Sequence, residues 1–149
     1  MIRDFSSKEN TSEFEDTKVN IKIKLSALWA CVTFFYIYGD YFELYVPGKV
    51  QGIINGNSML DNPLKLFAAS LLLAIPALMV CLSIILKQSV NRRLNLIVGG
   101  FFTAVMLLIA VTSFSEWRVF YVFYAIVESI LTSIIVINAW KWAKILKVN

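Results

Sequence analysis

Residues 119–140 read VFYVFYAIVESILTSIIVINAW, a run of 22 positions whose only charged side chain is Glu128. With a rise of about 1.5 Å per residue, this run is long enough to cross a hydrocarbon core of roughly 30 Å as a helix. Three other runs of similar length contain no Lys or Arg: 25–46, 66–86 and 94–114. None of the four shows the period-2 alternation of barrel strands. The sequence therefore predicts an all-α protein, a bundle of four transmembrane helices.

The basic residues predict the orientation of this bundle. Eleven of the 14 Lys and Arg residues precede the first run, lie between the second and third runs, or follow the fourth. The other three, Lys49, Lys65 and Arg118, lie on the opposite side of the membrane. The positive-inside rule then places both termini in the cytoplasm, an N-in, C-in topology. Topology and anionic lipid headgroups account for the net charge of +4, so we expect no nucleic-acid partner.

The chain divides into an arm and a membrane domain. Residues 1–20 are polar, carry five acids and show little apolar periodicity, which predicts a cytoplasmic arm. Residues 21–149 form the predicted four-helix membrane domain. The first apolar run is too long and begins too late for a cleaved signal peptide, so we expect it to stay in the mature protein.

Residue usage disfavours metal and cofactor chemistry. The chain has no histidine, and its two cysteines, Cys31 and Cys81, form no Cys-x-x-Cys pair. No glycine-rich phosphate loop and no nucleophile elbow occurs either. We therefore expect no metal, no cofactor and no catalytic residue of these classes, and an enzyme would be left with proton transfer alone.

Polar side chains recur in the first and fourth runs at spacings of three or four, which places each set on one helix face. These candidate site residues are Tyr36, Asp40 and Glu43 in the first run, and Tyr121, Tyr124 and Glu128 in the fourth. A carboxyl at this depth costs roughly 2.5–3.5 kcal/mol on insertion scales, so it is a functional candidate by default. If the two faces meet, they line an acidic, tyrosine-rich cavity that opens away from the termini.

Other interpretations of the same residues stay open. Tyrosines near the ends of spans also form interfacial aromatic belts, and Glu43 also fits a solvated acid paired with Arg118. For Asp40 and Glu128, the structural alternative is a protonated carboxyl that donates an interhelical hydrogen bond.

Two features of the middle spans concern movement and packing. Pro76 interrupts the second span near its midpoint and frees the carbonyl of Leu72, which predicts a kink and a candidate hinge. Gly99 and Gly100 in the third span predict a close approach to the second span, where Ser70, Ala74 and Ala77 supply small counterparts.

Four segments also carry a resemblance: KIKLSALW at 22–29, YIYGD at 36–40, LYVPG at 44–48 and NAWKW at 138–142. With these segments the chain resembles, over residues 19–142, a bacterial family of small four-span membrane proteins classed as a domain of unknown function. The resemblance implies four-helix architecture and a bacterial inner (cytoplasmic) membrane. It implies no activity.

Three classes of function fit these residues. The first is a protein that binds or transports a small cationic or amphipathic solute, with proton coupling through the intramembrane carboxyls. The alternative is an intramembrane receptor for a lipid-like ligand or a proton-transfer isomerase, and the second alternative is a structural or accessory membrane subunit. The lipid bilayer is the expected partner. Because four spans barely enclose a pathway, we also expect an oligomer, most simply a homodimer.

Overall fold

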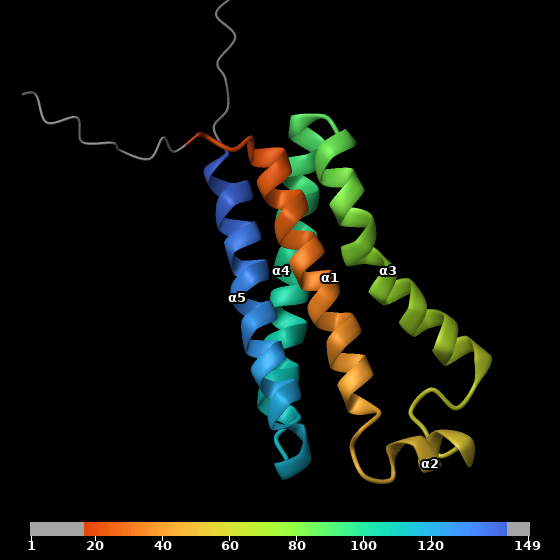
Figure 1. Cartoon of the computed structure of the whole chain (residues 1–149). Coiled ribbons are helices and arrows are strands. Elements are labelled where there is room, and N and C mark those ends of the chain that lie inside the picture. The colour runs from red at the N-terminus through yellow and green to blue at the C-terminus, as the bar shows by residue number, and fades with distance from the viewer. Residues whose placement is uncertain (1–16, 143–149) are drawn as a thin grey trace, which may run out of the picture.

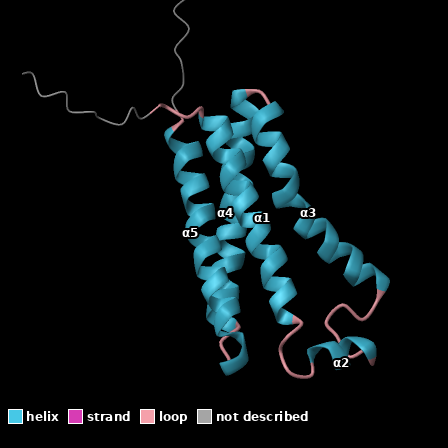
Figure 2. Ribbon diagram, in the orientation of Figure 1, coloured by secondary structure: helices cyan, strands magenta, loops and turns pink. Residues whose placement is uncertain are grey.

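The computed structural model describes residues 17–142, which contain four long helices and two short ones. The long helices are α1 (Ile21–Glu43), α3 (Pro63–Ile85), α4 (Gln88–Thr112) and α5 (Val119–Lys141). The short ones are α2 (Lys49–Ile54) and the 3-10 helix η1 (Glu116–Arg118). Figure 2 shows only helices and loops in this described part. Most of the predicted arm and the last residues of the predicted membrane domain lie outside it.

The predicted four-helix architecture is confirmed. Within residues 17–142, four helices are long and apolar enough to cross a membrane, so the chain is a multi-pass membrane protein. The first helix ends earlier than the predicted run, at Glu43 instead of residue 46. Pro47 restricts the backbone before it, and Gly48 adopts a left-handed conformation with φ of 78° that begins α2.

The helices pack in a definite order. Helices α4 and α5 are antiparallel neighbours, α1 packs against α5, and α3 packs mainly against α1 (Figure 1). The start of α1 and the end of α5 lie at one end of the bundle, which we call the termini end. Helices α2 and η1 lie at the opposite end, which we call the loop end.

Local contacts explain where the helices begin and end. The side chain of Asn20 accepts a hydrogen bond from the Lys22 backbone N–H at the start of α1 (2.9 Å). At the termini end, Lys22 Nζ donates to the carbonyls of Ile84 (3.1 Å) and Leu86 (2.7 Å), where α3 finishes. Each helix end leaves carbonyls without intrahelical partners, so this lysine ties the end of α3 to α1.

The glycines of α4 correct one expectation. A Cβ on Gly99 would lie 2.9 Å from Val136 Cγ2 of α5, whereas Gly100 has no such neighbour within 4 Å and is exposed. The predicted approach of this pair to the second span is therefore wrong. Gly99 instead permits close contact between α4 and α5, because it lacks the side chain that would hold the two backbones apart.

Helix α3 has two unlike halves, with Pro76 between them. The half near the termini end is held in place: Ser26 Oγ donates to the Val80 carbonyl (2.8 Å), and Met79 and Ser83 are buried. In the other half, residues 64–73 are exposed except for the partly exposed Ala69. This half leans away from α1 (Figure 1). The structure thus shows a helix that separates from the bundle, and the role of Pro76 as a hinge stays a prediction.

Candidate functional site

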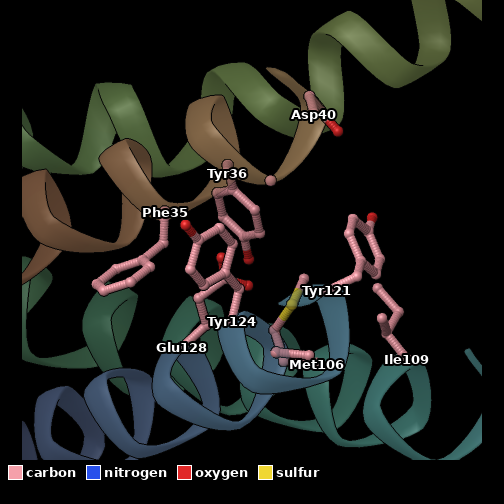
Figure 3. Close-up of a pocket in the computed structure, with 10 residues that line it drawn as sticks. Phe35, Tyr36, Asp40, Met106, Ile109, Tyr121, Tyr124 and Glu128 are labelled. Carbon is pink, nitrogen blue, oxygen red and sulfur yellow. The ribbon is translucent and has the colours of Figure 1, made fainter. Parts of the chain in front are cut away.

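A small cavity lies between α1, α4 and α5 toward the loop end (Figure 3). About 20 Å³ of it is open to the centres of water molecules. One water needs roughly 10–15 Å³ by the same measure, so the space has room for a water molecule. We call this space the carboxyl cavity, and its lining residues are Phe35, Tyr36, Gly39, Asp40, Met106, Ile109, Tyr121, Tyr124, Ala125 and Glu128.

Glu128 is the most deeply buried acid in the described part of the chain. Its residue is only 3% exposed, and no side chain of residues 17–142 hydrogen-bonds to its carboxyl. The hydroxyl of Tyr36, on α1, is also buried without a hydrogen-bond partner among these residues. Figure 3 shows Tyr36 directed toward Glu128 across the cavity. Two buried polar groups on different helices thus face one small space.

The geometry of α5 explains how Glu128 reaches this position. Tyr124, Glu128 and Thr132 follow one another at intervals of four, so their side chains share the helix face that meets α1 and α4. Thr132 Oγ1 donates to the Glu128 carbonyl (2.8 Å) and also bonds to Thr103 Oγ1 of α4 (2.8 Å). This hydroxyl pair ties α5 to α4 one turn beyond Glu128. It therefore fixes the rotation of α5 that aims the carboxyl into the cavity.

Asp40 lies at the rim of the carboxyl cavity. It lines the space but is itself exposed, and Figure 3 shows it apart from the Tyr36 and Glu128 side chains. Its neighbour Gly39 is buried, and a Cβ there would lie 3.7 Å from the rings of Tyr121 and Tyr124. Both rings therefore pack beside the α1 backbone at Gly39. Of the residues that line the cavity, Asp40 is the exposed one.

Glu43 is not part of the cavity lining. Its Oε1 accepts hydrogen bonds from Lys49 Nζ (2.9 Å) and from Arg118 (2.8 Å), so the predicted pairing with Arg118 is observed. The remaining basic residue of the loop end, Lys65, pairs with Asp61 (2.8 Å). All three loop-end cations are thus bound to acids outside the cavity. Among residues 17–142, no cation is paired with Glu128 or Asp40.

Five of the six site residues predicted from the sequence line the carboxyl cavity, and Glu43 does not. The contribution of α4 to the lining was not predicted. Met106 and Ile109 of that helix line the space, together with Phe35 and Ala125. Apolar residues in an apolar helix carry no signal that singles out such positions. Among the described residues, no group of three or more His, Cys, Asp or Glu side chains is placed to hold a metal ion.

The comparisons with known proteins bear on the family. Comparison with curated proteins and with solved structures found no match. A family model described as a family of unknown function (DUF6326) matches residues 12–147, which is nearly the whole chain. The resemblance stated from the sequence is thereby confirmed, while the bacterial origin and the inner-membrane location stay predictions. This four-helix membrane protein belongs to the DUF6326 family of unknown function.

Proposed function

We propose that this protein binds and exchanges a proton at Glu128 inside the membrane, with Asp40 at the entrance of the site. The observation that carries the proposal is a carboxyl that is 3% exposed and faces a cavity without a paired cation. An unpaired carboxylate in a low-dielectric site is costly, and desolvation disfavours the charged form of a buried acid. Because Lys49, Lys65 and Arg118 are all bound elsewhere, a proton is the simplest positive charge for this site.

The size of the cavity narrows the hypotheses drawn from the sequence. The volume open to the centres of water molecules is about 20 Å³, which is enough for a water. This size supports a proton carried by water better than a bound organic cation or a lipid-like ligand. The buried hydroxyl of Tyr36 supplies a hydrogen-bonding group for such a water or for Glu128 itself. The homodimer expected from the sequence stays a prediction.

Replacement of Glu128 tests the proposal. Glu128→Gln keeps the shape of the side chain and removes the titrating group, so the protein should fold but lose one carboxyl that changes protonation with pH. Infrared spectroscopy of the protein in lipid nanodiscs, with the carboxyl stretching band followed through a pH titration, measures this loss directly.

Glu116→Gln is the matched control. Glu116 is an exposed glutamate at the start of η1, so its removal should leave the band of the buried carboxyl in place. A titration curve of Glu128→Gln that coincides with that of the wild type would refute proton exchange at this residue. A purely structural Glu128 would then be the better explanation.

The termini end, in our proposal, faces the cytoplasm. The support is the eleven-to-three division of Lys and Arg together with the position of both described ends on the same side of the bundle. In a variant with Cys31 and Cys81 replaced by Ser, a membrane-impermeant thiol reagent added outside intact cells should label Asn57→Cys. The same reagent should miss Ser89→Cys in the first turn of α4, at the termini end. Both positions are exposed, so the reverse pattern would invert the orientation.

A further inference from the structure

The bundle contains a second buried polar cluster, near the termini end. We call it the asparagine cluster, and its residues are Trp29, Ser83, Asn91 and Asn95, all with 0% exposure. Trp29 Nε1 donates to Asn95 Oδ1 (2.7 Å), and Asn95 Nδ2 donates to Asn91 Oδ1 (2.6 Å). Asn91 Nδ2 in turn donates to the Ser83 carbonyl (2.5 Å), while the Ser83 hydroxyl has no partner among residues 17–142. The cluster joins α1, α3 and α4.

The two polar regions lie along the same helices at different depths. Tyr36 belongs to the carboxyl cavity and Trp29 to the asparagine cluster, and they are seven residues apart on α1. On α4, Asn91 and Asn95 belong to the asparagine cluster, and Thr103, eight residues after Asn95, bonds to Thr132 of α5. Polar groups therefore approach the middle of the bundle from both ends.

One buried ring packs against both regions. Phe102 of α4 is 1% exposed, and its ring centroid lies 6.0 Å from that of Tyr36 and 6.2 Å from that of Trp29. It thus packs against one member of each polar region. Ile135 of α5, with 0% exposure, belongs to the same apolar core. Gly99 of α4 packs so closely against Ile135 that this position of the core has no room for a further side chain.

We propose that Phe102 is the barrier between the carboxyl cavity and the asparagine cluster, and that protons and water cross the bundle only when this ring is displaced. Apolar constrictions exclude water, and a proton needs water or another hydrogen-bonding group to pass. Among the residues that line the cavity, Asp40 is exposed and Glu128 is buried. The inference rests on the proposed proton site at Glu128 and adds the position of its gate.

The experiment compares two neighbouring phenylalanines of α4. Phe102→Ala should remove the barrier, whereas Phe101→Ala changes a side chain that is 50% exposed on the outside of the bundle. The full chain is reconstituted into liposomes loaded with a pH-sensitive dye, and proton entry is driven by a potassium diffusion potential. We expect Phe102→Ala to raise the rate of proton entry at least tenfold over the wild type, and Phe101→Ala to leave it unchanged.

Folding is checked by circular dichroism and by gel filtration before reconstitution. A folded Phe102→Ala protein with the wild-type rate would overturn the proposal. If Phe102→Ala does not fold, Phe102→Leu takes its place, because leucine keeps an apolar side chain but lacks the ring. A smaller increase in proton entry is then expected, and a wild-type rate would again overturn the proposal.

A double variant separates this inference from the proposed function. If proton entry through Phe102→Ala depends on the carboxyl, Glu128→Gln in the same chain should reduce it toward the wild-type rate. Undiminished entry in the double variant would uphold the barrier and count against proton exchange at Glu128. Conversely, a Phe102→Ala protein with the wild-type rate of proton entry and with a Glu128 band that still titrates would refute the barrier at Phe102. That result would leave the proposed function standing.

Discussion

Gly99→Leu should separate α4 from α5 and destabilise the folded bundle more than any other single change of a small residue in α4. A Cβ at this position would already lie 2.9 Å from Val136 Cγ2 and 3.4 Å from Ile135 Cγ2. Both neighbours are β-branched and stiff in a helix, so the backbones must move apart to accept three further carbon atoms. Overpacking of a core usually costs roughly 1–3 kcal/mol, and we expect a loss of unfolding free energy at the top of that range or above it.

The same separation should break the hydrogen bond between Thr103 and Thr132, which lies one turn from Glu128 (2.8 Å). Unfolding in mixed micelles with increasing SDS measures the loss of stability. Gly100→Leu is the control, because a Cβ there meets nothing within 4 Å and the position is exposed. Equal stability of the two leucine variants would show that the α4 and α5 contact is not as close as described.

Trp29→Ala should have an effect of similar size for a different reason. The indole is fully buried, packs edge-on against Phe102 with 6.2 Å between centroids, and donates to Asn95 Oδ1 (2.7 Å). Truncation of a buried tryptophan to alanine costs roughly 3–5 kcal/mol in protein cores, since the cavity that remains fills only in part. The change also leaves the side-chain amide oxygen of Asn95 without its hydrogen-bond donor.

Two control variants divide the effect of Trp29→Ala into its parts. Trp29→Phe keeps a ring but removes the N–H and leaves a smaller cavity, so it should cost the roughly 1–3 kcal/mol of an unsatisfied buried acceptor plus part of the cavity term. Trp140→Ala removes a tryptophan that is 70% exposed and should change the stability by less than about 0.5 kcal/mol. The same SDS titration measures the loss of stability in all three variants. A loss for Trp29→Phe as large as that for Trp29→Ala would show that the phenyl ring recovers none of the stability that the indole supplies.

The number, type and approximate length of the spans could be predicted from the sequence alone. Backbone polar groups have no water to bond with inside a bilayer, so an apolar run of this length has little choice except a helix. The spacing of Tyr36 and Asp40 on α1 and of Tyr124 and Glu128 on α5 also follows from helix geometry. Because the acids cannot face lipid cheaply, the two helix faces that carry them could be expected to meet.

The partners of each helix were decided by the tertiary structure. Lipid is as apolar as leucine, so hydrophobicity does not indicate which side of a membrane helix faces another helix. Gly99 was expected against the second span and packs against α5, and Asn95 gave no sign of its bond to Trp29, 66 residues away. The position of Phe102 between the two polar regions likewise depends on three helices at once. Local sequence determines helices and their polar faces, whereas close packing of side chains distant in sequence determines which of those faces meet.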